Sequence, residues 1–248
     1  MQSELIRLSS VSLAYHTVAG ETIAINDLDL TVYEGEFLAI VGPSGCGKTS
    51  VLSLITGLLA PTAGTVSFAR EDLRAGYMLQ HDHLLDHRTV EKNVLLGLEV
   101  QHRLTPESKA RAMRLLDTYG LSEFRAYKPH QLSGGMRQKV ALIRTLAIEP
   151  DLLLLDEPFS ALDYQTRLTL SDEVFRIIRN EHKTAVLVTH DISEAVSMAD
   201  RVAVFSARPA SISAVLPIGF PPSMPPLERR GQPAFHDYFE RIRKELHI

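Results

Sequence analysis

The sequence contains little cysteine and no long apolar run. Cys46 is the only cysteine in 248 residues, so neither a disulfide within the chain nor a cysteine-based metal cluster can form. Such a chain suits a reducing compartment. No stretch approaches the roughly 18 apolar residues of a bilayer-spanning helix, and residues 1–10 lack the apolar core of a secretory signal. We therefore expect any association with a membrane to come through a partner.

The chain also lacks an excess of positive charge. Its formal net charge is -4 and its pI is ≈ 6.2, which argues against broad electrostatic binding to nucleic acid. Apolar residues make up 45% and charged residues 23% of the sequence, the balance of an ordinary globular protein. The length allows one large domain or a domain with a sizeable insertion.

Short apolar runs alternate with amphipathic segments along most of the chain. The apolar patterns predict strands at 6–15, 28–32, 37–41, 152–155, 185–188 and 202–205. Helical spacing predicts helices at 47–58, 106–119, 133–148, 165–180 and 192–198. Strands that alternate with helices indicate an α/β fold with a mainly parallel sheet covered on both faces.

Two segments depart from this alternation. Residues 82–149 carry charged helical patterns, which indicate a helical insertion. The prolines within 216–233 predict an extended connector, and residues 234–246 have the pattern of one short amphipathic helix.

The strongest motif is a phosphate-binding loop. It reads Gly42-Pro43-Ser44-Gly45-Cys46-Gly47-Lys48-Thr49 and is followed by Ser50. The glycines allow backbone amides to turn toward phosphate oxygens, and the following helix directs its positive dipole end at the same anion. Lys48 supplies a point charge to the outer phosphates, and Thr49 offers a hydroxyl to Mg2+. The buried strand before the loop favours this interpretation over a simple glycine-rich turn, so we expect the loop to bind MgATP.

A second motif brings two carboxylates to the end of a buried strand. The apolar run 152–155 is followed directly by Asp156 and Glu157. Ligands of open α/β sheets bind at the carboxyl ends of the strands, which places these acids beside the phosphate loop. We expect Asp156 to hold Mg2+, directly or through water, and Glu157 to polarise the attacking water.

A third motif opens another predicted helix. Ser133, Gly134 and Gly135 follow Leu132, and a serine hydroxyl with free amides at a helix N-terminus forms an anion site. The competing interpretation is a plain N-cap with flexible glycines. One nucleotide does not need two phosphate-binding motifs from the same chain, so the second motif requires its own explanation.

This combination of motifs resembles the ATP-binding subunits of ABC transporters over residues 4–215. In that family, the signature motif of one subunit caps the γ-phosphate of ATP bound to the opposite subunit. The resemblance implies a P-loop NTPase (ABC ATPase) core with a mainly parallel sheet, an N-terminal antiparallel β part and a helical subdomain. It assigns residues 1–216 to the ATPase domain, with the helical subdomain at about 82–149, and residues 217–248 to a proline-rich connector and a C-terminal helix.

The resemblance also assigns roles to individual residues. Tyr15 matches the aromatic that stacks on adenine, with a core aromatic as the alternative. Gln80 matches the glutamine that contacts Mg2+ and the attacking water and senses the membrane partner. Asp163, in the loop 160–163, matches a residue that contacts the other subunit. His190 matches the histidine that contacts the γ-phosphate and links Glu157 to it.

Two positions and one segment depart from the family pattern. Met136 stands where glutamine is commoner, and Ser50 stands where a second threonine is usual. The segment 81–87 lacks a Pro-Trp pair often seen before Thr89, which leaves the contact with the membrane partner undefined.

The same segment contains potential metal ligands, His81, Asp82, His83, Asp86 and His87. We prefer to interpret it as a solvated loop at a partner interface.

Cys46 lies at a helix N-terminus beside Lys48, and such surroundings lower the pKa of a thiol. We therefore expect alkylation of Cys46 to slow ATP hydrolysis. The alternative is an inert small side chain that fills the loop.

The function implied by the resemblance is to energise a bacterial importer. The runs 205–209 and 135–138 and the short tail resemble the subgroup that imports nitrate, sulfonates, taurine and related small solutes. The implied partners are a membrane-spanning permease, a second ATPase subunit (most simply another copy of this chain), and an extracytoplasmic solute-binding protein reached through the permease. The implied location is peripheral, on the cytoplasmic face of the inner membrane.

Two other functions are compatible with the same motifs. The first is an ABC ATPase that acts on nucleic acid or ribosomes without a membrane partner, although such relatives usually have two fused ATPase units or long coiled-coil insertions. The second is a regulatory subunit without catalytic activity, and the presence of Lys48, Asp156, Glu157 and His190 argues against it.

Overall fold

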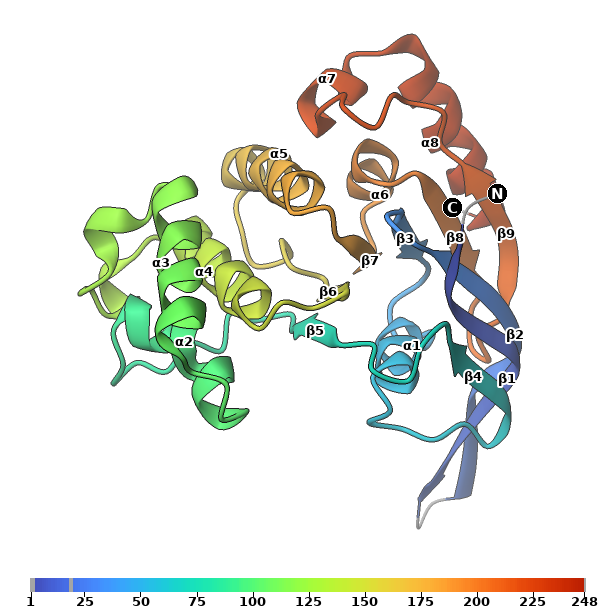
Figure 1. Cartoon of the computed structure of the whole chain (residues 1–248). Helices are drawn as coiled ribbons and strands as arrows, with labels where there is room; N and C mark the ends of the chain where they lie inside the picture. The colour runs from blue at the N-terminus through green and yellow to red at the C-terminus, as the bar shows by residue number, and fades with distance from the viewer. Residues whose placement is uncertain (1–2, 18–19, 248) are drawn as a thin grey trace.

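The strands of the chain form two sheets (Figure 1). The computed structural model describes residues 3–17 and 20–247. Within them, an antiparallel sheet of order β2-β1-β4 consists of β1 (Glu4–Thr17), β2 (Gly20–Tyr33) and β4 (Ala63–Phe68). The main sheet has the order β5-β6-β7-β3-β8-β9. Its strands are β3 (Phe37–Val41), β5 (Ala75–Met78), β6 (Leu152–Asp156), β7 (Thr184–Thr189), β8 (Arg201–Phe205) and β9 (Ile212–Pro217).

The main sheet is parallel except at its β9 edge, which pairs antiparallel with β8. This confirms the predicted α/β fold with a mainly parallel sheet. Every residue of β3, β6 and β7 is buried, because both faces of the sheet are covered. Phe37, Ala39 and Val41 face one apolar core, and Leu38 and Ile40 face the other.

The helices cover the two faces of the main sheet unequally. On one face, α1 (Lys48–Ile55) shares a core with β1 and β2. The other face is covered by α4 (Gly134–Ala147), α5 (Tyr164–Asn180) and α6 (Ile192–Met198). In Figure 1, α2 (Val90–Val100) and α3 (Pro106–Thr118) lie beside α4 at the left, away from the antiparallel sheet. No helix in the described part of the chain is long and apolar enough to cross a bilayer.

Helix α2 was not predicted from the sequence. Its N-cap is Thr89, whose hydroxyl accepts a hydrogen bond from the amide of Lys92 at 3.3 Å. Gly97 interrupts the pattern, since a glycine inside a helix usually weakens it. Here a Cβ at Gly97 would lie only 2.6 Å from Cγ2 of Ile148, so the glycine permits close packing of α2 on the end of α4.

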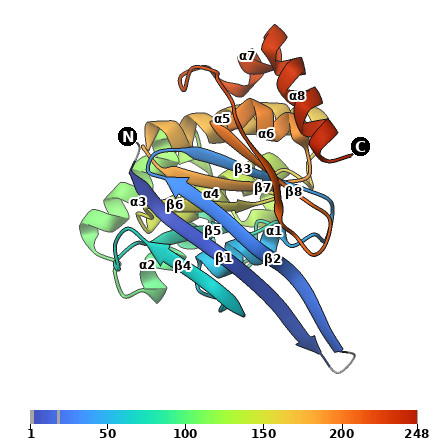
Figure 2. The ribbon, with the colours of Figure 1, turned by 90° about the vertical axis from the view of Figure 1, so that its right-hand side faces the viewer.

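The C-terminal segment packs back onto two helices of the main body, α5 and α6. α7 (Pro226–Arg230) and α8 (Pro233–Glu245) lie at the top of Figure 2, beside α5 and α6. An extended connector throughout 216–233 was therefore wrong for residues 226–230. The helix forms there because proline suits the first turn of a helix, and because the guanidinium of Arg229 is fully buried and donates to the carbonyls of Ala199 (3.0 Å) and Met224 (2.8 Å).

Candidate functional site

The loop between β3 and α1 is fixed by contacts on both sides. A Cβ at Gly42 would lie 2.9 Å from Cβ of Phe205, so the backbone packs directly against β8. Gly47 has φ 124, a left-handed conformation that favours glycine. The ammonium of Lys48, which is 5% exposed, donates to the carbonyls of Gly42 (2.8 Å) and Pro43 (2.9 Å). The side chain of Lys48 therefore folds back over the loop and places a positive charge near the N-terminus of α1.

Asp156 accepts two hydrogen bonds at the end of β6. Its Oδ1 accepts from the hydroxyl of Thr49 at 3.2 Å, and its Oδ2 accepts from the hydroxyl of Tyr77 at 3.1 Å. Burial raises the pKa of Asp156, while the hydrogen bonds from Thr49 and Tyr77 act in the opposite direction. Burial, together with the charge of Asp156, also raises the pKa of Tyr77. A carboxylate and a hydroxyl are hard oxygen ligands of the kind that Mg2+ prefers, so these residues fit that cation.

Glu157 and His190 meet at the ends of neighbouring strands. Nδ1 of His190 lies 3.0 Å from Oε2 of Glu157. Glu157 has φ 43, a left-handed conformation that is uncommon for residues other than glycine. Its amide donates to the carbonyl of Val188 at 2.9 Å and its carbonyl accepts from the Ser160 hydroxyl at 3.0 Å. Strained backbone of this type is often found at functional sites.

One pocket gathers most of the predicted nucleotide site. Its volume is about 390 Å³, and its lining comprises Tyr15, Ala24, Ser44, Gly45, Gly47, Lys48, Thr49, Ser50, Gln80, Glu157 and Arg208. The hydroxyl of Tyr15 lies 2.9 Å from that of Ser50, so the tyrosine lines this pocket while it also packs, partly buried, against the core around α1. Neither Arg208 nor Tyr77 was predicted as a site residue: Arg208 lies in the run 205–209, which indicated only the importer subgroup, and Tyr77 lies in no motif.

The third motif lies outside this pocket. Ser133 is the N-cap of α4, and its hydroxyl accepts from the amide of Met136 at 3.3 Å. Gly135 lines a different pocket of about 350 Å³ between α4 and α5. A Cβ at Gly134 would lie 3.2 Å from Cδ2 of Leu162, so the motif rests on the loop 160–163. Asp163 is the N-cap of α5. One copy of the chain therefore does not bring the two motifs predicted to bind phosphate to the same pocket.

The structure corrects the expectation for Cys46. Its side chain is 2% exposed and belongs to the core around α1. Burial raises the pKa of the thiol, although the charge of Lys48 acts in the opposite direction. The lowered pKa expected from the sequence was therefore wrong, because Cys46 faces the core while its neighbours face the pocket.

The histidine-rich segment after Gln80 is held by α4. Asp82 pairs with Nε of Arg137 at 3.0 Å, and the guanidinium of Arg144 donates to the carbonyls of Asp82 (2.7 Å) and His83 (2.8 Å). Among the described residues, no group of three or more acidic, histidine or cysteine side chains is arranged to hold a metal ion. The segment thus connects Gln80 to the helix that begins with the third motif.

Comparisons with known proteins agree with this geometry. A family model described as ABC transporter matches residues 25–160. An uncharacterized ABC transporter ATP-binding protein, YtlC of Bacillus subtilis, is 45% identical over 97% of this chain and 95% of its own. The aliphatic sulfonates import ATP-binding protein SsuB of Bacillus licheniformis is 37% identical over 91% of this chain and 88% of its own. The nitrate import ATP-binding protein NrtC of Synechococcus elongatus is 39% identical over 92% of this chain, which spans 35% of that longer protein.

A solved structure shares the fold. It is the dimeric post-hydrolysis state of an ATP-binding cassette bound to ADP and Pi, with a TM-score of 0.73 at 30% identity. The match covers 87% of this chain and 100% of the cassette.

Proposed function

We infer the function of this chain from its family: it belongs to the ABC transporter family of ATP-binding proteins. It binds ATP and is an ATPase.

We propose that Lys48 and the amides of the loop bind the phosphates of ATP, while Tyr15 contacts the base. One observation carries the proposal: the loop, Gln80 and Glu157 line a single pocket, and Thr49 in that pocket is bonded to Asp156. Thr49, Asp156 and Gln80 would hold Mg2+, which neutralises phosphate charge when it is bound.

In this proposal Glu157 orients and polarises the attacking water, since its carboxylate lines the pocket. The imidazole of His190 would direct that carboxylate, because its Nδ1 is within hydrogen-bonding distance of Oε2. The water loses a proton toward Glu157 as it attacks the γ-phosphorus, and ADP leaves with Lys48 still at its β-phosphate.

We further propose that two copies complete two nucleotide sites. Ser133, Gly134 and Gly135 lie apart from the pocket that contains Lys48, so they serve ATP held by a second subunit, with Asp163 near the contact. ATP between the subunits stabilises the closed dimer, and hydrolysis removes the bridging phosphate and allows reopening.

The dimer is proposed to drive a membrane permease that imports a small anion, such as nitrate or an aliphatic sulfonate. The relatives whose names include nitrate and aliphatic sulfonate import support this substrate class. The chain would then lie on the cytoplasmic face of the membrane, held there by the permease, with an extracytoplasmic solute-binding protein on the other side. We assign residues 1–216 to the ATPase domain and residues 217–248 to an accessory tail.

Affinity capture of the tagged chain from detergent-solubilised membranes of its own cell tests the transport assignment. Recovery of a multi-span permease, identified by mass spectrometry, is the expected result. Recovery of ribosomal or DNA-associated proteins alone would overturn the importer assignment in favour of an ABC ATPase without a membrane partner, and the ATPase assignment would stand.

A further inference from the structure

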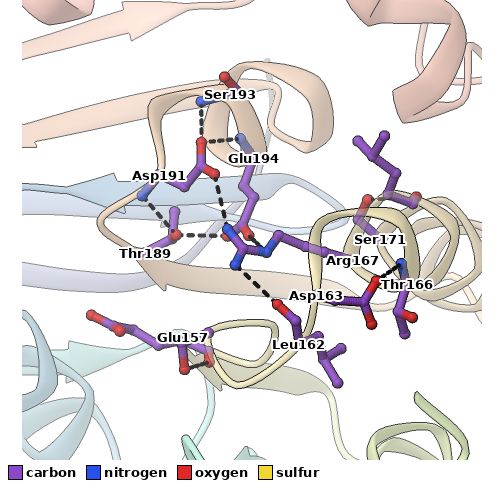
Figure 3. A network of polar contacts seen from close by, with 12 residues as sticks. Glu157, Leu162, Asp163, Thr166, Arg167, Ser171, Thr189, Asp191, Ser193 and Glu194 are labelled. Carbon is purple, nitrogen blue, oxygen red and sulfur yellow. Dashed lines mark hydrogen bonds and ion pairs between the residues drawn. The ribbon is translucent and has the colours of Figure 1, made fainter. Parts of the chain in front are cut away.

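The side chain of Arg167 joins two loops of the hydrolysis site (Figure 3). It lies in the first turns of α5, and its Nη2 donates to the carbonyl of Leu162 at 3.1 Å. Its Nη1 donates to Oδ2 of Asp191 at 3.4 Å, and its Nε lies 3.8 Å from Oε1 of Glu194. The guanidinium thus touches the loop before α5 on one side and the segment that follows His190 on the other.

The two acids are themselves fixed around His190. Oδ1 of Asp191 accepts from the amides of Ser193 (2.7 Å) and Glu194 (3.3 Å), which caps α6. The hydroxyl of Thr189 donates to Oε2 of Glu194 at 2.7 Å and accepts from the amide of Asp191 at 3.0 Å. The residues on both sides of His190 are therefore linked to one another by hydrogen bonds. A displacement of Asp191 or Glu194 would be passed to the backbone of His190.

The other end of the bridge leads back to Glu157. The amide of Leu162 donates to the carbonyl of Phe159 at 3.1 Å, and both the amide and the hydroxyl of Ser160 bond the carbonyl of Glu157. Together with the 3.0 Å contact between Glu157 and His190, these bonds form a ring through both loops. Arg167 is the side chain that closes this ring.

The charge balance favours a cation at this point. Asp191 and Glu194 lie side by side, and Glu194 is 3% exposed. The side chain of Asp191 is 30% exposed, so the buried carboxylate of Glu194 has the greater need of a positive partner. Arg230 of α7 also interacts electrostatically with Asp191 and Glu194. Among the described residues, however, only Arg167 is seen to hydrogen-bond both Asp191 and the Leu162 carbonyl, while its Nε forms an ion pair with Glu194 at 3.8 Å.

We propose that Arg167 is a positioning residue, which sets His190 against Glu157 according to the position of the loop 160–163. This inference rests on the roles proposed above for Glu157 and His190. Because Leu162 also packs under Gly134 of the third motif, a second subunit that seats on this motif would shift the Leu162 carbonyl. Arg167 would pass that shift to His190, so that hydrolysis follows correct assembly of the dimer.

To contact the Leu162 carbonyl and the two acids at the same time, the side chain at position 167 needs N–H donors that point in different directions. A guanidinium provides separate N–H donors for the carbonyl and the acids, whereas an ammonium acts as a compact point charge. The variant Arg167→Lys therefore keeps the charge beside Asp191 and Glu194 but cannot hold the Leu162 carbonyl at the same time. Arg176→Lys is a matched control, since this arginine lies on the same helix, has an exposed side chain and pairs with Asp172 at 2.9 Å.

The test is steady-state ATPase kinetics of the purified full chain with MgATP, together with thermal unfolding. We expect Arg167→Lys to unfold near the wild-type temperature and to lose about 10- to 100-fold in kcat with little change in KM, while Arg176→Lys matches wild type. Wild-type kcat in a folded Arg167→Lys protein would overturn the inference.

A double-mutant cycle with His190→Ala separates this inference from the proposed function. If Arg167 acts through His190, single-turnover rates of His190→Ala and of the double variant Arg167→Lys/His190→Ala should be equal. Multiplying losses would overturn the inference and leave the role of His190 standing. Wild-type turnover in His190→Ala alone would overturn both.

Discussion

The carboxylate of Glu157 and the imidazole of His190 lie 3.0 Å apart, although they are 33 positions apart in the sequence. Glu157 follows β6 and His190 follows β7, and these two strands are adjacent and parallel in the main sheet. Their carboxyl ends meet at the same edge, so the pairing of two buried strands brings the acid to the histidine.

The negative charge of Glu157 is expected to be essential for ATP hydrolysis. Glu157→Gln keeps the shape of the side chain and a hydrogen bond to His190 but removes the basic oxygen. We expect a loss of about 10²- to 10⁴-fold in phosphate release, unchanged ATP binding, and an ATP-dependent dimer on size exclusion. Glu240→Gln, in the tail, is the control. Ordinary turnover in Glu157→Gln would show that another group orients the water.

Tyr77 offers a test of the cation site. Removing its hydroxyl in Tyr77→Phe leaves Oδ2 of Asp156 without its 3.1 Å donor, and the carboxylate becomes harder to keep ionised. We expect the Mg2+ concentration for half-maximal ATPase activity to rise several-fold and the free energy of unfolding to fall by about 1–2 kcal/mol. Tyr238→Phe, which removes a hydroxyl bonded to the Gly219 amide, should change stability without changing the Mg2+ requirement. Equal Mg2+ titrations for wild type and Tyr77→Phe would contradict the assignment.

Glu194 predicts a dependence of stability on pH. Burial raises its pKa from 4.5 to about 7, against the opposing effects of Thr189, Arg167 and His190, while Asp191 raises it further. Between these two values the folded protein binds a proton that the unfolded chain releases, so this contribution to stability is full below pH 4.5 and is lost as pH rises through about 7. The loss should amount to about 2–4 kcal/mol.

The neutral variant Glu194→Gln isolates this contribution. The free energy of unfolding of Glu194→Gln, measured by urea titration, should increase relative to that of wild type as pH rises from 5 to 8. Arg230 also interacts electrostatically with Glu194, so Arg230→Gln serves as a second comparison. Its free energy of unfolding should fall more steeply with pH than that of wild type. Parallel pH profiles for wild type and Glu194→Gln would refute a raised pKa.

The tail depends on Arg229. Its guanidinium is fully buried, bonds three carbonyls, and lies 4.9 Å from the ring centroid of Phe175 and 5.7 Å from that of Phe220. Arg229→Met leaves those carbonyls unsatisfied, and we expect it to cost about 2–4 kcal/mol and to expose the tail to protease. Arg241→Met, on the exposed face of α8, is the control. Wild-type protease resistance in Arg229→Met would show that other contacts hold the tail.

Local patterns in the sequence were enough to predict most of the fold. The buried runs predicted β3 and most of β6, and the serine cap predicted the start of α4, because each depends on neighbouring residues. Helix α2 could not be predicted from the sequence, because Gly97 interrupts its helical pattern. The glycine is needed there for close packing against Ile148. The expected lowering of the Cys46 pKa was also wrong, because the core that buries this thiol includes strands that are distant in the sequence.

The candidate site divides in the same way. Lys48, Thr49, Asp156 and Glu157 stand in motifs whose spacing carries chemical meaning. Tyr77 and Arg167 stand in no such motif, and their value lies in contacts that only the folded sheet creates. The Tyr77 hydroxyl reaches an acid 79 positions away, and no local pattern encodes that distance.

The separation of Ser133 from the pocket of Lys48 has a genetic consequence. In the proposed dimer, a chain carrying Lys48→Ala and a chain carrying Ser133→Ala would each form homodimers in which both nucleotide sites are defective. A mixed dimer would combine both lesions in one site and leave the other site whole. Two defective alleles should therefore complement each other in the same cell, and a single allele carrying both lesions should not be rescued by either.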